Sequence, residues 1–269
     1  MTKQTYIKKH QLWLNVLFAS FAIDDQKIKS DLFDFSQIMF RHMKWLGEHL
    51  LEQGDDYNYD RDGMMLYKRK DLFEILNALI EEIDTIQSFY DNSQLAHRIQ
   101  SDDTYIKEYI TQLLAQPTRN QPITAFSMER KWEDLDQEQI DALTLFLFDE
   151  SYKEYELILI YAYMQARTTN LQHYNVFQDL VDESYFHLKS FGNMMAKLGI
   201  LALPRELHEM TYIVKDLQQF VKDGIDEEIA AKEMCKELSD AIKDEKLSKF
   251  FDFINEQESY HIELMQKLL

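Results

Sequence analysis

Apolar residues recur every three or four positions over most of this chain, which is the spacing of one buried face on an α-helix. In the first half the pattern predicts helices over about 6–22, 31–53, 69–90 and 103–115. In the second half it predicts helices over about 135–167, 174–198 and 204–223, and two more between 226 and 269. Three glycines are expected to end or break helices: Gly54, Gly199 and Gly224. The expected fold class is all-α.

The segment over residues 116–126 holds two of the three prolines of the chain and predicts a domain boundary. We expect a helical bundle over 1–115, a linker over 116–134 and a second bundle over 135–269. The second bundle should contain four long core helices and one extra connecting helix. The chain is long enough for two domains of this size.

An internal repeat supports two related halves. The hexapeptide HMKWLG, which begins at His42, resembles HLKSFG, which begins at His187. Each is followed at the same distance by a glycine, Gly54 or Gly199, and the two copies are 145 residues apart. We therefore expect two related four-helix bundles in tandem.

Composition excludes several classes of protein. The formal net charge of −19 argues against nucleic acid and anionic membranes as partners. The single cysteine, Cys235, excludes an intrachain disulfide framework. An apolar run over residues 12–23 resembles part of a signal peptide, but Asn15 interrupts it, so we expect a first helix and a cytoplasmic protein without a membrane span.

The last predicted helix contains a candidate half of a metal site. Glu258 and His261 are three residues apart, so an oxygen and an imidazole nitrogen can reach one point from the same helix face. Glu228, on the preceding helix, lies 33 residues before His261. Bundle di-metal centres use such sets, with Glu from two helices and a Glu-x-x-His pair from each of the other two.

A second half-site repeats this arrangement. Glu154 lies 33 residues before His187, and Glu183 lies one helical turn before the same histidine. Carboxylate and imidazole ligands suit iron or manganese better than metals that prefer thiolates. The two half-sites together predict a pair of metal ions in the second bundle.

From about residue 138 to the C-terminus, these motifs resemble the ferritin-like di-metal carboxylate superfamily, in particular its rubrerythrin-like branch without the rubredoxin module. The resemblance implies two iron or manganese ions, with these ligands: Glu154, Glu183, His187, Glu228, Glu258 and His261. It also implies an oxidoreductase that reacts with dioxygen or hydrogen peroxide as a ferroxidase or peroxidase. The alternative is a helical scaffold or binding protein with a vestigial site.

One pair departs from the family pattern, because Glu183 and His187 are separated by three residues instead of two. Either that helix contains a π-bulge, or Glu183 is not a ligand and Asp182 or Glu150 replaces it. Tyr161 is the candidate catalytic residue, since its hydroxyl can hydrogen-bond a ligand carboxylate.

The first half has lost most of this constellation. The 145-residue separation places Lys9 at the position of Glu154 and Ile38 at that of Glu183, although His42 matches His187. We expect a degenerate first bundle that binds no metal and packs as a second subunit would. The chain would then be a monomeric pseudo-dimer or a homodimer.

Overall fold

The computed structural model describes residues 1–269, except for the side chain of Tyr67. The described secondary structure is helical, apart from an isolated bridge between Asp71 and Pro122. The chain divides into two compact units, residues 1–127 and 128–269. Backbone hydrogen bonds from Leu72 to Gln121 and from Ile123 to Lys70 hold part of the expected linker against the first unit.

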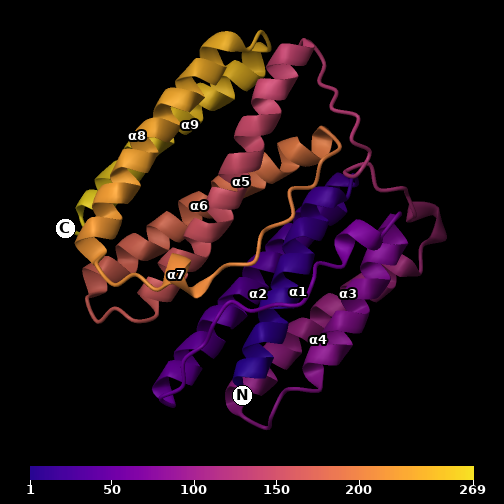
Figure 1. Ribbon diagram of the computed structural model, residues 1–269. Helices are drawn as coiled ribbons and strands as arrows, with labels where there is room; N and C mark the ends of the chain where they lie inside the picture. The colour runs from indigo at the N-terminus through magenta and orange to yellow at the C-terminus, as the bar shows by residue number, and fades with distance from the viewer. The chain divides into compact units, whose positions relative to one another are not determined.

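The first unit contains four long helices: α1 (Lys3–Ala22), α2 (Gln26–Glu52), α3 (Leu72–Gln87) and α4 (Gln94–Leu114). Two short 3₁₀ turns, Leu66–Lys68 and Pro117–Arg119, flank α3 and α4. Helix α1 packs against α2 and α3, and α3 packs against α4 (Figure 1). The polar Asn15 within the apolar run of α1 is buried, and its amide donates to the Glu82 carboxylate at 2.7 Å.

The second unit also contains four long helices, α5 (Gln137–Gln165), α6 (Leu171–Lys197), α8 (Leu217–Ala241) and α9 (Glu245–Gln266), with the single-turn α7 (Glu209–Tyr212) between α6 and α8. The helices pack as two extensive pairs, α5 with α6 and α8 with α9. Contacts of α6 with α9 and of α5 with α8 join the pairs (Figure 1). The all-α prediction is confirmed, whereas the tandem four-helix bundles stay a prediction.

An apolar cluster fills one end of the second unit. Its centre is formed by Phe146, Phe191 and Phe251 from three different helices, and each of the three is less than a tenth exposed. The ring of Phe146 meets the other two edge to face, with centroid distances of 5.7 and 5.3 Å. This cluster fixes the spacing of α5, α6 and α9 one to two turns away from the predicted metal ligands.

The prediction for residues 204–223 was wrong. Between residues 204 and 215, only the single turn α7 is helical. Asp216 caps α8, because its carboxylate accepts a hydrogen bond from the amide of Gln219. Helix α8 continues through Gly224, because the glycine leaves room for the buried side chain of Met265, whose Sδ would lie 3.2 Å from an added Cβ. Tertiary packing thus overrides the low helix propensity of glycine.

Two other helices begin earlier than the sequence pattern predicts. Asp25, and not a residue near 30, caps α2 by accepting the amides of Lys27 and Ile28. Ser93 caps α4, so that Asp103 lies inside the helix and is buried. In both cases a polar capping residue stands before a stretch that lacks a clear apolar period.

The ends of α2 and α6 are alike in detail. Gly54 and Gly199 have φ of 78° and 76°, the left-handed region in which glycine is favoured. The amide of Asp55 donates to Leu50 and that of Ile200 to Met195, at 2.9 and 3.0 Å. These bonds form the same C-terminal motif. The two donors are 145 residues apart in the sequence, and so are the two acceptors, as the internal repeat requires.

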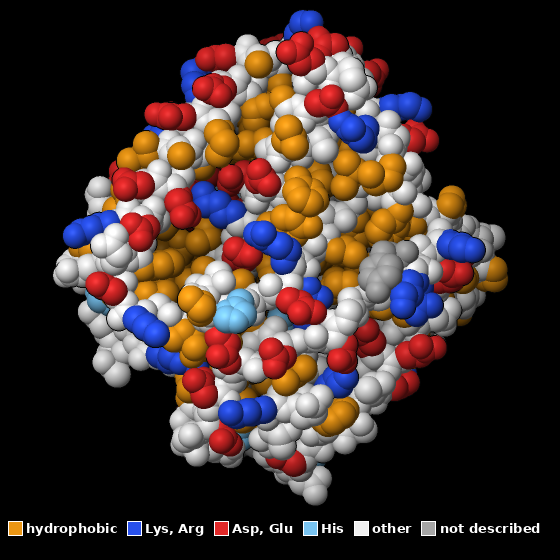
Figure 2. All heavy atoms as spheres, in the orientation of Figure 1, with side chains coloured by type: hydrophobic (Ala, Val, Ile, Leu, Met, Phe, Trp, Pro, Cys, Tyr) orange, Lys and Arg blue, Asp and Glu red, His pale blue; other side chains and the backbone are white. Residues whose placement is uncertain are grey.

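Charged side chains of both signs are spread over the surface. On the face drawn in Figure 2, acidic and basic groups alternate with apolar ones and do not gather into one basic patch. None of the described helices combines the length and the apolar character that a membrane span needs.

Candidate metal centre

The structure brings the six predicted ligands together inside the second unit. Glu154 comes from α5, Glu183 and His187 from α6, Glu228 from α8, and Glu258 and His261 from α9. The described residues form three possible metal-binding triads, and within each triad the three ligand atoms lie within 4.8 Å of one another. The triads are Glu183, His187 and His261; Glu154, His187 and Glu258; and Glu228, Glu258 and His261. Each triad is drawn from these six residues.

The α5–α6 side of the centre is organised by His187, which is fully buried. Its Nδ1 lies 2.9 Å from Oε1 of Glu154, and its Nε2 lies 3.2 Å from Oε1 of Gln257 on α9. The amide of Gln257 in turn donates to Oε2 of Glu183 at 2.9 Å. Gln257 therefore links the two residues of α6 and fixes the orientation of the imidazole.

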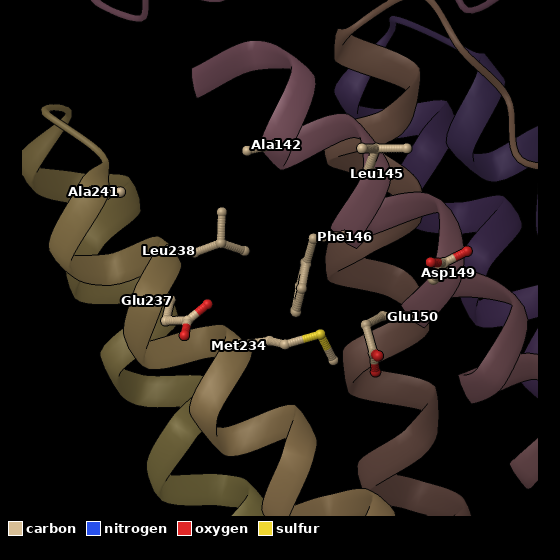
Figure 3. A pocket seen from close by; sticks show the side chains of 9 residues that line it. All are labelled: Ala142, Leu145, Phe146, Asp149, Glu150, Met234, Glu237, Leu238 and Ala241. Atoms are coloured by element: carbon tan, nitrogen blue, oxygen red, sulfur yellow. The ribbon is translucent and has the colours of Figure 1, made fainter. Parts of the chain in front are cut away.

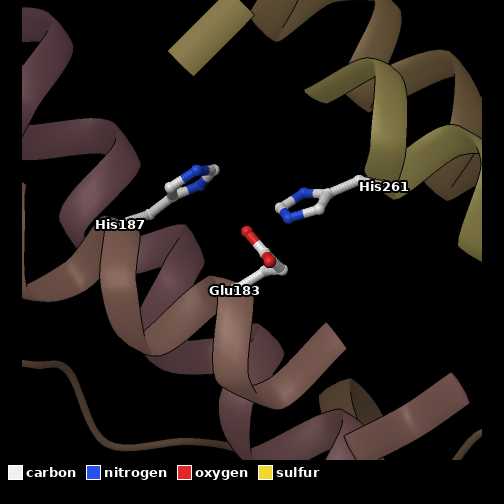
Figure 4. A group of neighbouring side chains, drawn as sticks. All are labelled: Glu183, His187 and His261. Carbon is white, nitrogen blue, oxygen red and sulfur yellow. The ribbon is translucent and has the colours of Figure 1, made fainter. Parts of the chain in front are cut away.

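The α8–α9 side is organised by Glu258. One of its oxygens lies 3.0 Å from Nδ1 of His261, and the other lies 3.6 Å from Nδ1 of His187. Nδ1 of His261 is also 3.8 Å from the Glu228 carboxylate. The two imidazole rings are 5.0 Å apart, and Figure 4 shows both histidines and Glu183 directed toward one region. Glu258 thus lies where a carboxylate could bridge two ions.

Several buried polar atoms at the centre lack a hydrogen-bond partner. They include Nε2 of His261, Oε2 of Glu154, Oε2 of Glu258 and the hydroxyl of Tyr161. An unsatisfied buried polar atom is unfavourable, and such atoms are rare in folded proteins. Oxygen and nitrogen ligands about 2.0–2.2 Å from a metal ion lie roughly 3 Å from one another. The closest carboxylate–imidazole pairs here are 2.9 and 3.0 Å apart, and two further pairs are 3.6 and 3.8 Å apart. The donor set therefore fits divalent metal ions.

The charges in the cluster shift the ionisation of both histidines. Burial lowers the pKa of His187, but the charge and hydrogen bond of Glu154 and the charge of Glu258 outweigh it, and the net shift is upward. The pKa of His261 is also raised against the effect of burial, by the neighbouring carboxylates of Glu228 and Glu258. Both imidazoles therefore hold a proton toward their carboxylates, in the position that a metal ion would take.

The two carboxyl groups of the α8–α9 side shift in opposite directions. Burial raises the pKa of Glu258 to about 8. Burial also acts to raise the pKa of Glu228, but its neighbours His261 and Glu258 and the charge of Lys153 lower it below its usual value. In the metal-free protein, Glu258 therefore holds a proton more readily than Glu228 does.

A lysine that the sequence did not single out lies beside the centre. Nζ of Lys153 is 3.9 Å from Oε2 of Glu150, which is itself buried. Burial lowers the pKa of Lys153, but the charges of Glu228, Glu150 and Glu154 raise it well above its usual value. The carboxylates therefore have one permanent cation of the chain close to them.

The structure also bears on the open alternatives. Glu183 and His187 meet without a π-bulge, since α6 is a continuous α-helix and residues four apart share a face. Asp182 is exposed and accepts a hydrogen bond from Gln178, outside the centre. Tyr161 is buried close enough for the charges of Glu228 and Glu154 to act on its pKa, after the larger effect of burial, but its hydroxyl makes no hydrogen bond to a ligand.

Gln257 and Lys153 were missed because neither residue type belongs to the ligand pattern. Their sequence positions carried the one available signal, since each immediately precedes a predicted ligand, Glu258 or Glu154. Such a neighbour lies about 100° around the helix, so the pattern alone does not show that it reaches the same space.

The first unit contains a related cluster without a metal-binding triad. Nζ of Lys9 lies 2.5 Å from Oδ1 of Asp103, and both side chains are fully buried. Nδ1 of His42 is 3.9 Å from the same oxygen, and the hydroxyl of Tyr90 donates to the other oxygen at 2.5 Å. Lys9 and His42 are the residues that the repeat matches to Glu154 and His187. The Lys9 ammonium group thus stands where the second unit has the Glu154 carboxylate, and Asp103 supplies its counter-charge.

No family model, curated protein or solved structure matches this chain.

Proposed function

We propose that this chain is a metal-dependent oxidoreductase whose second unit is a ferritin-like four-helix bundle that holds two iron or manganese ions. The reaction class that fits best is oxidation by dioxygen or hydrogen peroxide, of the ferroxidase or peroxidase type. In the same proposal the first unit is the degenerate copy of that bundle. The pairing of α5 with α6 and of α8 with α9, joined by the α6–α9 and α5–α8 contacts, supports this architecture.

The observation that carries the proposal is the convergence of four carboxylates and two imidazoles from four helices on one buried space. Four negative charges and two neutral imidazoles balance two divalent ions. In a chain that did not bind metal, only the protonated histidines and Lys153 would offset the charge of these acids.

The geometry suggests a division of roles among the ligands. Glu154 and His187 would hold one ion, Glu228 and His261 would hold the other, and Glu258 is within reach of both sets. Glu183 lies near both histidines and would complete the donor set. The bound ions would supply the redox chemistry and open positions for the oxidant. Burial of all these residues except Glu183 limits the access of water. The buried Tyr161 hydroxyl, which makes no hydrogen bond, would be available to hold a proton.

Lys153 is the observation that favours the second candidate, a helical scaffold with a vestigial site. Its ammonium group already compensates part of the carboxylate charge. In that case the chain would remain folded without metal, and replacement of Lys153 by methionine would strongly destabilise it.

Metal analysis of protein purified without chelators tests the proposal. We expect about two iron or manganese ions per wild-type chain, and the loss of at least one in a double variant with Glu258→Ala and His261→Ala. A matched control replaces an exposed pair of the same types, Glu256→Ala and His97→Ala, and should keep both ions.

The activity is then measured as oxidation of added Fe(II) by dioxygen or hydrogen peroxide, which the double variant should lose and the control should retain. An equal metal content in wild type and double variant would refute the assignment. Metal-free wild type that also depends on Lys153 for its stability would establish the scaffold instead.

A further inference from the structure

A pocket of about 400 Å³ opens between α5 and α8 (Figure 3). It is lined by residues 142–150 of α5 and 234–241 of α8, which recur at the three- and four-residue spacing of one helix face. Its walls are mainly apolar, and Phe146 and Leu238 come from the apolar cluster of the second unit. The volume lies in the range of small-molecule sites, about 300–1,000 Å³.

The polar groups of this pocket are all acidic. Asp149 and Glu237 are exposed, whereas Glu150 is only 6% exposed. No lysine or arginine is among the lining residues. The nearest cation to Glu150 that the structure shows is Lys153, at 3.9 Å, which is too long for a hydrogen bond and leaves the carboxylate able to receive a closer donor.

We propose that the pocket binds a small organic amine, with the apolar body of the ligand between Phe146 and Leu238 and its ammonium group at Glu150. An anion would be repelled by three carboxylates, and a neutral apolar molecule would cover Glu150 without giving it a hydrogen-bond partner beyond its 3.9 Å ion pair with Lys153. A charge-assisted hydrogen bond from an ammonium group gives it one. This inference goes beyond the oxidoreductase proposal, because it requires neither metal nor oxidant.

The position of Glu150 makes the pocket relevant to the metal centre. Glu150 lies one helical turn before Glu154 on the same face of α5, and the charge of Glu154 acts on it. An amine bound at Glu150 therefore lies beside the ligands of the centre. The pocket would present an organic molecule to that centre from the α5–α8 side.

Binding to the full-length protein can be followed by calorimetry or by NMR with three probes of one shape: 4-phenylbutylamine, 4-phenylbutanol and 4-phenylbutanoate. We expect saturable binding of the amine, at least tenfold weaker binding of the alcohol, and none of the carboxylate. The same ranking is expected after dialysis against a chelator, so a protein that fails the metal assay can still pass this one.

Variants locate the binding. Glu150→Gln should weaken amine binding about tenfold and leave alcohol binding unchanged, because it removes one charge-assisted bond. Ala142→Trp should remove binding of both by filling the pocket. Glu233→Gln, an exposed residue of α8 that does not line the pocket, should change neither.

Each variant is first checked for an unchanged helical spectrum and cooperative unfolding. Equal affinity for amine and alcohol would overturn the proposal, and so would amine binding that is insensitive to Glu150→Gln. A third contrary result is a pocket covered by a second copy of the chain. It would appear as a dimer that dissociates on Leu145→Glu, with no amine binding by the monomer.

Discussion

Tyr161 illustrates how a single hydroxyl can report on the centre. Its ring is 1% exposed and its hydroxyl lacks a partner, although charged groups surround it. In metal-free protein we expect Tyr161→Phe to raise the free energy of unfolding by about 1 kcal/mol, because it removes a buried donor that makes no bond. Urea unfolding of both proteins in chelator measures this. A lower stability of the variant would mean that the hydroxyl is bonded to buried water.

His10 should make the stability of the first unit depend on pH. Burial lowers its pKa to about 3, although its contact with the Asp60 carbonyl opposes the shift. The folded state therefore excludes a proton that the unfolded state binds at pH 6.5 and below. The contribution of neutral His10 is fully present above pH 6.5 and is lost as the pH falls toward 3.

Comparison with His10→Gln isolates this effect. Between pH 7 and pH 5, the wild type should lose about 2 kcal/mol more of its unfolding free energy than the variant does. Denaturant unfolding at the two pH values gives the four free energies. Equal losses in both proteins would show that His10 is accessible to protons in the folded state.

At the residue scale, the sequence predicted which six side chains converge better than it predicted the residues around them. Glu258 and His261 could be paired because helix geometry places residues three apart on one face, and the same holds for Glu183 and His187 at four. The contacts of Gln257 and Lys153 depend on how two helices cross, which no spacing within one helix encodes. The buried pair of Lys9 and Asp103 was invisible for the same reason, since its members are 94 residues apart.

At the scale of elements, α8 shows where the predictions reached their limit. Gly224 was expected to break the helix. Whether a glycine does so depends on what packs against it, and here the side chain of Met265 lies against it. The ends of α2 and α6 were predicted correctly because a glycine with positive φ is a local requirement. Local chemistry was therefore readable from the sequence, whereas the continuity of a helix across a packed glycine was not.

Gly224→Ala tests this interpretation. The alanine gains up to about 1 kcal/mol of helix propensity, and the flexible end of Met265 must shift slightly, so we expect a net stabilisation of about 0.5 kcal/mol by denaturant unfolding. Gly54→Ala is the matched control. It meets no atom within 4 Å but has a φ of 78°, so it should destabilise by about 1 kcal/mol through the backbone alone. Destabilisation by Gly224→Ala would show that Met265 cannot move.

At the scale of the whole molecule, the two units balance their buried charges differently. Lys9→Met should destabilise the first unit by about 3–5 kcal/mol, because it leaves Asp103 buried without its cation. The metal content should not change, since all six candidate ligands lie in the second unit. Unfolding and metal analysis of the same preparation measure both. Adding Asp103→Leu should restore much of the lost stability, and a failure to do so would assign the loss to packing.

The ammonium group of Lys9 has a consequence for the life of the protein in a cell. The first unit carries within its own chain the cation that neutralises Asp103. The second unit, on the proposed function, would need metal ions from the cell to balance its buried carboxylates. Under metal starvation the two halves would then differ in their resistance to proteases, with cleavage concentrated in residues 128–269. The amount of intact chain would follow the availability of metal without a separate sensor.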